Sequence, residues 1–408
     1  MNIALLTFEF HPWIVGGLGT YSTEFSWRAV RRGHMVDVYA FNPGDLEERG
    51  FWRGVHVYRP RVFDFTPALR RIVCQELRGW GSGLRYFSDV LMYNMLSVKE
   101  FLYGPSSDVV SVHDWLSAFA GITLSKLGKG PVVFHVHSTE RGRTLGGGSS
   151  LVSSLELEMG RNASAIVTVS NAMREQLISE GFQPEKITVI HNGVDPDTFN
   201  PSRVSREERM EVRERHGVGE EDRMILYLGR LVRAKGVENL LEAFRIVSRE
   251  DRTVKLVVVG LGELQGTVEE FSRQPDVEGK VSYRFEFLPT EEKVRYYAAC
   301  DLAVFPSLYE PFGIVALEAM AMQKPVVVGA RGVSGFRDTV VPSGPEQCGV
   351  HVNGYDPTDI AWGIRAVLED PDRSREMGLN GRRRVLEKFT WERCVEETLQ
   401  LYSQLLTR

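Results

Sequence analysis

The stretch that decides the fold is IALLTFEFHPWIVGGLGTYSTEFSWRAVRRGHMVDVYAF, residues 3–41. A strand-like run at 3–10 is followed by GGLG and by a segment with helical spacing that ends at Gly33. A second strand-like run closes the stretch at 34–41. A strand, a glycine-rich turn, a helix and a strand form a right-handed βαβ unit. The chain is therefore predicted to begin with a parallel α/β sheet.

The same alternation continues along the chain and restarts once. The break is residues 194–222, a polar, turn-rich segment followed by a charged helix, which has the character of a linker. Strand-like runs before it lie at 108–114, 131–138, 165–171 and 187–194, and those after it lie at 224–231, 255–262, 281–288, 301–307, 324–330 and 348–353. Short apolar runs are typical of parallel strands covered on both faces. The sequence predicts two doubly wound α/β domains that face each other across a ligand cleft.

The composition excludes several kinds of partner. The 408 residues are 43% hydrophobic and 25% charged, and the net charge of −5 points neither to nucleic acid nor to an anionic membrane. The cysteines, Cys74, Cys300, Cys348 and Cys394, form no CxxC motif, which suits a reducing cytoplasm. The start MNIALLTFEF has no basic n-region, and no apolar run reaches the roughly 18 residues of a membrane span. We expect a cytoplasmic protein without signal peptide or transmembrane segment, and the oligomeric state stays open.

Two turns after strands could bind a diphosphate. In GGLG, Gly16 and Gly17 let the backbone approach a phosphate at a helix N-terminus, although a tight strand-to-helix turn is an equal alternative. The motif is not a full GxGxxG and carries no P-loop lysine, which weakens a nicotinamide interpretation. In GRLVRAKG (229–236), Arg230 and Lys235 can neutralise a diphosphate, with a solvated charged loop as the alternative.

The most specific segment is SLYEPFGIVALEAM, residues 307–320. A helix is expected to start after its Pro-Phe-Gly loop, where the first N–H groups lack intrahelical partners and can bind sugar hydroxyls or phosphate. Those N–H groups belong to Gly313, Ile314 and Val315. Glu310 and Glu318 lie in apolar surroundings, and a buried carboxylate costs several kcal/mol unless it is partnered. Ligand hydroxyls are the preferred partners, and a capped core helix with one internal salt bridge is the alternative.

Polar side chains also end two strands of the first domain. VHDW (112–115) and FHVHST (134–139) place Asp114 and His137 at the rim of the cleft. Because His135 and His137 alternate along the strand, we expect them on opposite faces, with His137 in the cleft. His113 next to Asp114 suggests a metal, but no third ligand has suitable spacing.

Three further motifs carry less information. VDPD (194–197) matches a DxD metal-binding pattern, but its place in the linker favours a turn. GLGEL (260–264) is either a turn or a contact of a nucleotide base. RGR (141–143) and GGGSS (146–150) form either a mobile acceptor loop that prefers anions or a solvated basic loop. We predict no metal site.

Taken together, the motifs resemble a known family. The chain is similar to the retaining nucleotide-sugar glycosyltransferases of family 4 (group 1), of the glycogen synthase and sucrose synthase type. The resemblance covers nearly the whole chain through GGLG, HDW, VTVSN, HNGVDPDTF, GRLVRAKG and FPSLYEPFGIVALEAMAMQKPVV. It implies the GT-B fold, with an acceptor-binding Rossmann-like domain at 1–200 and a nucleotide-sugar-binding one at 201–388. The C-terminal helix, about 389–408, would pack back on the first domain.

The resemblance gives each candidate residue a role. Glu310 and His137 would lie beside the donor sugar, and Glu318 would bind the nucleotide ribose. The catalytic set implied is His137, Arg230, Lys235 and Glu310. The substrate-binding set implied is Gly16, Gly17, Asp114, Phe312, Gly313, Ile314, Val315 and Glu318. Among these, Arg230, Lys235 and the Gly17 amide would contact the donor diphosphate, Phe312 to Val315 the sugar hydroxyls, and Asp114 the acceptor side.

The implied reaction moves a hexose, with glucose as first choice, from an ADP-, UDP- or GDP-hexose to a hydroxyl of a carbohydrate or small acceptor. Retention at the anomeric carbon and independence of metals and cofactors are part of that implication. Ile14 and Val15 stand where bacterial glycogen synthases have Lys-Thr, so the nucleotide stays open. The alternatives are a mannosyl- or glucosyltransferase for a small or phosphorylated acceptor, a GT-B epimerase, and a non-catalytic sugar-nucleotide-binding module.

Overall fold

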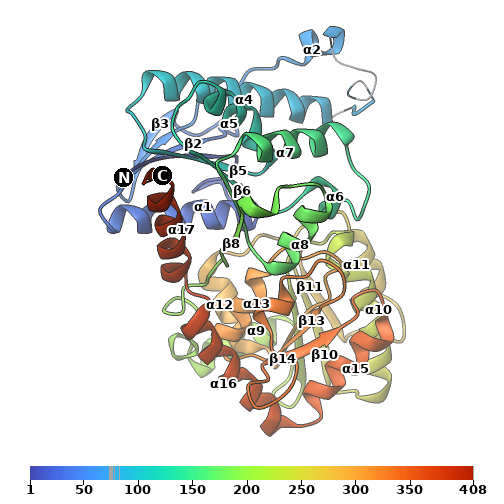
Figure 1. Ribbon diagram of the computed structural model, residues 1–408. Coiled ribbons are helices and arrows are strands. Elements are labelled where there is room, and N and C mark those ends of the chain that lie inside the picture. The colour runs from blue at the N-terminus through green and yellow to red at the C-terminus, as the bar shows by residue number, and fades with distance from the viewer. Residues whose placement is uncertain (73–76, 78, 82, 408) are drawn as a thin grey trace.

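The computed structural model describes residues 1–72, 77, 79–81 and 83–407. Within these residues the chain forms two α/β halves, each built on a largely parallel sheet, which lie one above the other in Figure 1. The prediction of two doubly wound domains is confirmed. No helix in the described part of the chain is long and apolar enough to cross a membrane. Cys300, Cys348 and Cys394 are buried free thiols, and Cys74 lies outside the described residues.

The first sheet has the strand order β3-β4-β2-β1-β5-β6-β7-β8. Its strands are β1 (Asn2–Thr7), β2 (Met35–Ala40), β3 (Arg49–Trp52), β4 (Val55–Tyr58), β5 (Val109–His113), β6 (Val132–Val136), β7 (Ala165–Thr168) and β8 (Ile187–Val189). Its helices are α1 (Gly17–Arg31), α2 (Thr66–Ile72), α4 (Gly83–Tyr103), α5 (Ala118–Lys126), α6 (Glu140–Arg143), α7 (Ser150–Asn162) and α8 (Asn171–Ser179). Strands β5 and β6 are buried along their whole length because α1 covers one face of the sheet while α4, α5 and α7 cover the other (Figure 1).

The second sheet has the order β11-β10-β9-β12-β13-β14. Its strands are β9 (Arg223–Leu228), β10 (Val254–Val259), β11 (Val281–Arg284), β12 (Leu302–Phe305), β13 (Val326–Gly329) and β14 (Gly349–Val352). Its helices are α9 (Arg206–Arg215), α10 (Val237–Glu250), α11 (Gln265–Ser272), α12 (Thr290–Ala299), α13 (Ile314–Ala321), α14 (Phe336–Thr339), α15 (Pro357–Leu368) and α16 (Pro371–Lys388). The strand order reverses between β9 and β12, and such a switch point opens a crevice at the carboxyl ends of the strands. GRLVRAKG follows β9 and SLYEPFG follows β12, so the topology brings these two motifs together.

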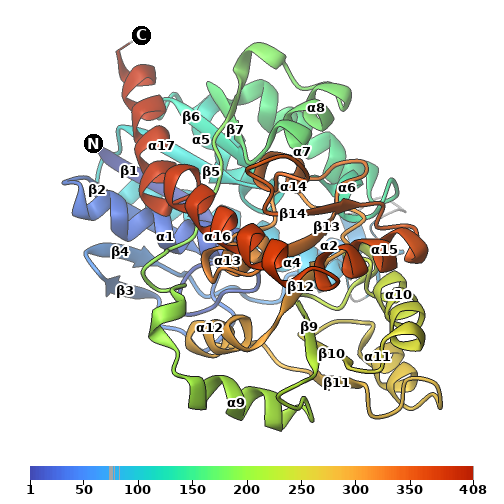
Figure 2. The same cartoon turned by 90° about the horizontal axis from the view of Figure 1, so that it is seen from below.

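The chain crosses between the halves twice, and the two crossing segments lie side by side. The Val194 N–H donates to the Phe389 carbonyl oxygen at 2.9 Å, and Val194 forms a β-bridge with Thr390. A Cβ added at Gly193 would lie 2.2 Å from the carbonyl carbon of Thr390, so this crossing requires glycine. Figure 2 shows α16 leading into α17 (Trp391–Leu406) after the second crossing.

Helix α17 packs beside α1 of the first half (Figure 1). The two helices are joined by the buried Arg28, whose Nε lies 3.0 Å from the Glu392 carboxylate. The hydroxyl of Tyr402 reaches the sheet and donates to Ser111 Oγ at 2.8 Å. The last helix of the chain is therefore part of the core of the first half.

Two parts of the fold differ from what the sequence predicts. The β3–β4 antiparallel hairpin at the sheet edge carries only a short alternating pattern, RGFW-RG-VHVY, and sequence analysis missed it. Strand β1 ends at Thr7 rather than at Phe10, because the chain turns before GGLG: Phe10 and Trp13 exchange backbone hydrogen bonds of 3.0 and 3.1 Å.

Candidate functional site

Loops from the two sheets face each other across the cleft and touch at several points. A Cβ added at Gly17, the first residue of α1, would lie 3.9 Å from Ile314 Cδ1 at the start of α13. The Tyr309 hydroxyl accepts the Thr139 N–H at 3.3 Å. The structure therefore brings the GGLG turn of the first half onto the SLYEPFG segment of the second.

The centre of the site is an ion pair between Lys235 and Glu310. Lys235 Nζ lies 2.6 Å from Glu310 Oε2, and Ser307 Oγ donates to the same oxygen at 3.0 Å. The pair forms because the loop after β9 presses on the loop after β12: a Cβ at Gly236 would lie 2.1 Å from the Pro306 oxygen. Arg230 of the predicted set is exposed, and its guanidinium has no partner in the described part of the chain.

The start of α13 presents free backbone donors. Gly313 caps the helix with φ +91°, and a Cβ there would lie 2.1 Å from the Phe336 ring, so glycine is required. No acceptor among the described residues takes the N–H groups of Gly313, Ile314 and Val315. Phe312 is buried under this turn. The predicted helix start is confirmed, and these N–H groups carry the partial positive charge of a helix N-terminus.

Glu318 is buried one turn into α13 and has protein partners. Lys293 Nζ lies 3.3 Å from its Oε1, and the Tyr297 hydroxyl donates to its Oε2 at 3.0 Å. Glu310 is likewise paired, with Lys235. Burial of the two carboxylates therefore does not by itself require ligand hydroxyls. The alternative interpretation of the sequence was a capped core helix with one internal salt bridge. The structure contains two such ion pairs, Lys235–Glu310 and Lys293–Glu318.

A carboxylate that sequence analysis missed organises the GGLG turn. Glu9 Oε2 accepts the N–H groups of Val15 and Gly16, each at 2.9 Å, and of Gly19 at 3.3 Å. Burial raises the pKa of Glu9, and these three backbone donors lower it. The Gly16 amide is thus already taken, whereas the Gly17 amide has no acceptor among the described residues. The only signal for Glu9 in the sequence is an acidic residue at the end of the apolar run IALLTFEF.

The histidines of the first half form one cluster. His113 Nδ1 lies 3.0 Å from His137 Nε2, and the His135 and His137 rings are stacked with centroids 6.4 Å apart. The prediction that His135 and His137 face opposite sides of the strand is wrong, because residues two apart in a strand point the same way. Asp114 is buried with φ +52°, and its Oδ1 accepts the His137 N–H at 2.7 Å. The carboxylate of Asp114 therefore shapes the turn that holds His137.

Part of the RGR–GGGSS segment is helical rather than a loop. Residues Glu140–Arg143 form α6, and Arg143 lies between the carboxylates of Glu140 (3.2 Å) and Glu156 (3.8 Å). Burial raises the pKa of Glu156 to about 8. Arg143 serves these internal carboxylates, which leaves the exposed Arg141 as the cation of this segment that can face a ligand.

Tyr309 fastens the two halves together. Its hydroxyl donates to Met173 Sδ at 3.3 Å, and a Cβ at Gly142 would lie 2.1 Å from its ring. Next to it, Ser170 Oγ donates to the Pro311 carbonyl oxygen at 2.6 Å. Tyr309, which precedes Glu310 in the sequence, is thus inserted into the first half. The position of Glu310 therefore depends on contact between the halves.

Replacing Gly142 by alanine is expected to displace Tyr309 and to weaken this contact. Overpacking of a filled site costs about 1–3 kcal/mol, so the thermal midpoint should fall and the molecule should become more extended in solution scattering. Gly147→Ala is the matched control, since the nearest atom to an added Cβ there is 3.6 Å away. Equal midpoints and equal scattering for the two variants would contradict the role of Tyr309.

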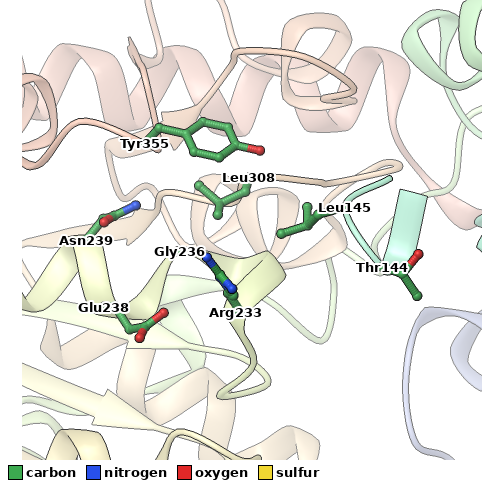
Figure 3. A pocket seen from close by; sticks show the side chains of 8 residues that line it. All are labelled: Thr144, Leu145, Arg233, Gly236, Glu238, Asn239, Leu308 and Tyr355. Carbon is green, nitrogen blue, oxygen red and sulfur yellow. The ribbon is translucent and has the colours of Figure 1, made fainter. Parts of the chain in front are cut away.

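A cavity of about 530 Å³ lies between the halves (Figure 3). Its lining residues are Thr144, Leu145, Arg233, Gly236, Glu238, Asn239, Leu308 and Tyr355. Leu145 and Leu308, one from each half, both line the cavity, with the Tyr355 ring above Leu308 in Figure 3, and Leu145 has the unusual φ of +54°. The cavity adjoins the site because Gly236 follows Lys235, and most of its lining side chains are polar, with Leu145, Leu308 and the Tyr355 ring as its apolar part.

The DxD pattern of the linker forms a turn. Asp195 accepts the Asp197 N–H at 3.1 Å and the Thr198 hydroxyl at 2.8 Å. Over the described ranges, no group of three His, Cys, Asp or Glu side chains is placed to hold a metal ion.

Comparison with known proteins agrees with this geometry. The model of the family "Glycosyltransferase Family 4" matches residues 15–198, and that of "Glycosyl transferases group 1" matches residues 208–384. The chain is 34% identical to a glycosyltransferase of Methanocaldococcus jannaschii over 98% of each chain. It is 31% identical to the alpha-maltose-1-phosphate synthase of Mycolicibacterium smegmatis, over 99% of this chain and 100% of that one.

Among solved structures, the fold resembles sucrose-phosphate synthase from Thermosynechococcus elongatus, with a TM-score of 0.82 and 22% identity over 100% of this chain and 99% of that chain. The two sheets that face across a cleft are thus those of the GT-B fold. On the strength of the family models and the full-length relatives, the chain belongs to the group 1 glycosyltransferases of family 4.

Proposed function

We propose that the protein transfers a hexosyl group, with glucose as first choice, from a nucleoside diphosphate sugar to an acceptor hydroxyl with retention and without a metal. The observation that carries this is the Lys235–Glu310 pair at 2.6 Å, in the loop that leads to the open N-terminus of α13, which Gly17 of the other half approaches at Ile314. A cation and free N–H groups suit a diphosphate, and a carboxylate beside them suits sugar hydroxyls. In this arrangement Arg230 adds a second cation on the diphosphate.

The hardest step is departure of the diphosphate, whose charge grows as the bond from anomeric carbon to phosphate oxygen breaks. Lys235, Arg230 and the Gly17 N–H would stabilise that charge in place of a metal. The acceptor oxygen bonds to the anomeric carbon from the same face, and its proton passes to the departing phosphate oxygen. This scheme needs no carboxylate nucleophile, unlike retaining glycosidases. The close pairing of Glu310 with Lys235 favours a binding role for this carboxylate.

The remaining candidates divide between donor and acceptor. Glu318, with Lys293 and Tyr297 beside it, would hold the ribose. His137 would contact the donor sugar, and Asp114 would support the acceptor side through the turn that it caps.

The acceptor would enter through the cavity of Figure 3. The two charged lining residues, Arg233 and Glu238, carry opposite formal charges that sum to zero, which favours an uncharged carbohydrate. The Tyr355 ring is about half exposed and offers an apolar face to a sugar ring. The alpha-maltose-1-phosphate and sucrose-phosphate synthases carry phosphorylated products in their names, so a hexose phosphate is the competing acceptor in the test.

The direct test is a panel of ADP-, UDP- and GDP-glucose, first for thermal stabilisation and then for transfer to a glucan oligosaccharide or to a hexose phosphate. We expect one donor to stabilise the protein, and transfer to the oligosaccharide to persist in EDTA. NMR of the product should show the anomeric configuration of the donor. Loss of activity in EDTA would refute the metal-free scheme, an inverted product would refute retention, and preference for the hexose phosphate would refute the uncharged acceptor.

Replacing Tyr355 by alanine is expected to raise the acceptor KM by roughly 3- to 10-fold, the worth of one aromatic contact, and to leave donor binding unchanged. Tyr103→Ala is the control, because Tyr103 is 87% exposed at the end of α4, away from the cleft. Acceptor kinetics at saturating donor measure the effect. An unchanged acceptor KM would exclude the cavity as the acceptor site.

A further inference from the structure

A chain of hydrogen bonds runs from the C-terminal helix to the cleft. The Tyr402 hydroxyl donates to Ser111 Oγ at 2.8 Å, and Ser111 Oγ lies 2.9 Å from His113 Nε2. His113 Nδ1 lies 3.0 Å from His137 Nε2. At the other end, His135 Nε2 lies 2.8 Å from the same Tyr402 hydroxyl. Tyr402, Ser111 and His113 are fully buried, whereas His137, at the end of β6, is partly exposed.

The imidazoles of His113 and His135 in this chain of hydrogen bonds are neutral. Burial lowers the pKa of His113 and His135 well below 6.5. A neutral imidazole donates from one nitrogen and accepts at the other, so each hydrogen bond fixes the direction of the next. The whole chain therefore has two possible directions, which differ in the end that carries the spare N–H.

The geometry selects one direction. At the Tyr402–Ser111 contact the tyrosine is the donor, so Ser111 is left to donate to His113 Nε2, and His113 donates from Nδ1 to His137 Nε2. The spare N–H then sits on His137 Nδ1. Both Nδ1 atoms are buried without a partner, but the opposite direction would leave the spare N–H on His135, a residue that is 1% exposed and that no ligand can reach, whereas His137 is partly exposed.

We infer that Tyr402, Ser111 and His113 are positioning residues that fix His137 in its Nδ1–H tautomer, so that it offers a hydrogen-bond donor to an oxygen of the bound donor sugar. His137 Nδ1 has no partner in the described part of the chain, which leaves this donor for a ligand. The sugar as recipient rests on the proposed function, whereas the tautomer is a property of the protein alone. A residue of the last helix, more than 260 positions along the chain, thus sets the chemistry of a cleft histidine.

The test reads the tautomer directly in protein labelled with ¹⁵N-histidine, by long-range ¹H–¹⁵N correlation without ligand. We expect His137 to be protonated on Nδ1 and His135 on Nε2. Ser111→Ala and Tyr402→Phe should each make His137 a mixture of tautomers and lower kcat about 5- to 10-fold, the worth of one hydrogen bond, with the donor KM less affected. Ser111→Thr keeps the hydroxyl and should restore both tautomer and rate.

Tyr21→Phe is the matched control. The Tyr21 hydroxyl is also buried and contacts the same helix, at Thr398 (3.4 Å), and the Tyr21 ring packs on the same histidines. Tyr21 is not part of the hydrogen-bond chain. The substitution should leave the tautomer of His137 unchanged. Protonation of His137 on Nε2 in the wild type, or an unchanged His137 tautomer in both Ser111→Ala and Tyr402→Phe, would overturn the inference. If His137 and His135 show the expected tautomers but the protein transfers no sugar, the proposed function is refuted and the inference about the tautomer of His137 still holds.

Discussion

Replacing Lys235 by methionine is expected to lower kcat about 10²–10³-fold, the usual effect of removing one preorganised charge that meets the transition state. The loss has two sources. In the proposed function the departing diphosphate would lose one of its cations, and Glu310 would lose the partner that lies 2.6 Å away, leaving its carboxylate with Ser307 alone among the described side chains. An unpaired buried carboxylate takes up a proton or shifts, and either change misplaces the sugar. Initial rates at saturating donor and acceptor measure the effect.

Lys255→Met is the control for loss of a lysine in the same domain. Lys255 lies on β10, where its ammonium donates to the Gly279 carbonyl oxygen at 2.9 Å on the exposed surface. The double variant Lys235→Met with Glu310→Gln separates the two sources, because residues in one ion pair act non-additively. Its rate should fall little below that of Lys235→Met alone. Additive losses would mean that the two side chains act independently, and a loss under threefold for Lys235→Met would remove it from the site.

The sequence was sufficient for the parts of the site that lie in one continuous segment. In SLYEPFGIVALEAM, the loop glycine, the helix start and the two carboxylates follow from local rules about caps and burial. The sheet order also brings GRLVRAKG beside it, because motifs that follow central parallel strands meet at one edge. These rules locate a cleft and its donors without any knowledge of distant contacts.

The parts that escaped prediction depend on partners far apart in the chain. Lys293 neutralises Glu318 from another helix, and no local pattern marks that lysine. Glu9 takes the Gly16 amide that local reasoning left free for phosphate. Tyr402 joins the histidine cluster only because the chain crosses back after α16. Sequence spacing shows which groups need a partner, but the tertiary fold decides which residue supplies it.

Lowering the pH from 6.5 to 5 is expected to lower the free energy of unfolding through His113 and His135. Both pKa values are well below 6.5 in the folded protein because burial disfavours the charged imidazole. The unfolded chain therefore binds more protons below pH 6.5, and the free energy of unfolding falls as the pH falls. Their stabilising contribution is fully present above pH 6.5 and is lost below it.

Glu156 acts in the opposite sense, so the test compares variants. Its folded pKa of about 8 exceeds the ordinary value of 4.5, which means that the folded protein binds the extra proton and gains stability between pH 8 and 4.5. His135→Gln keeps an amide that can reach Tyr402 and should make the fall in unfolding free energy between pH 6.5 and 5 smaller by roughly half of the two-histidine effect. Glu156→Gln should make the same fall larger.

Urea titrations at stepped pH values give both differences, and their opposite signs distinguish buried histidines from a general effect of acid on the fold. A wild-type slope retained in His135→Gln would show that folding does not lower the pKa of His135.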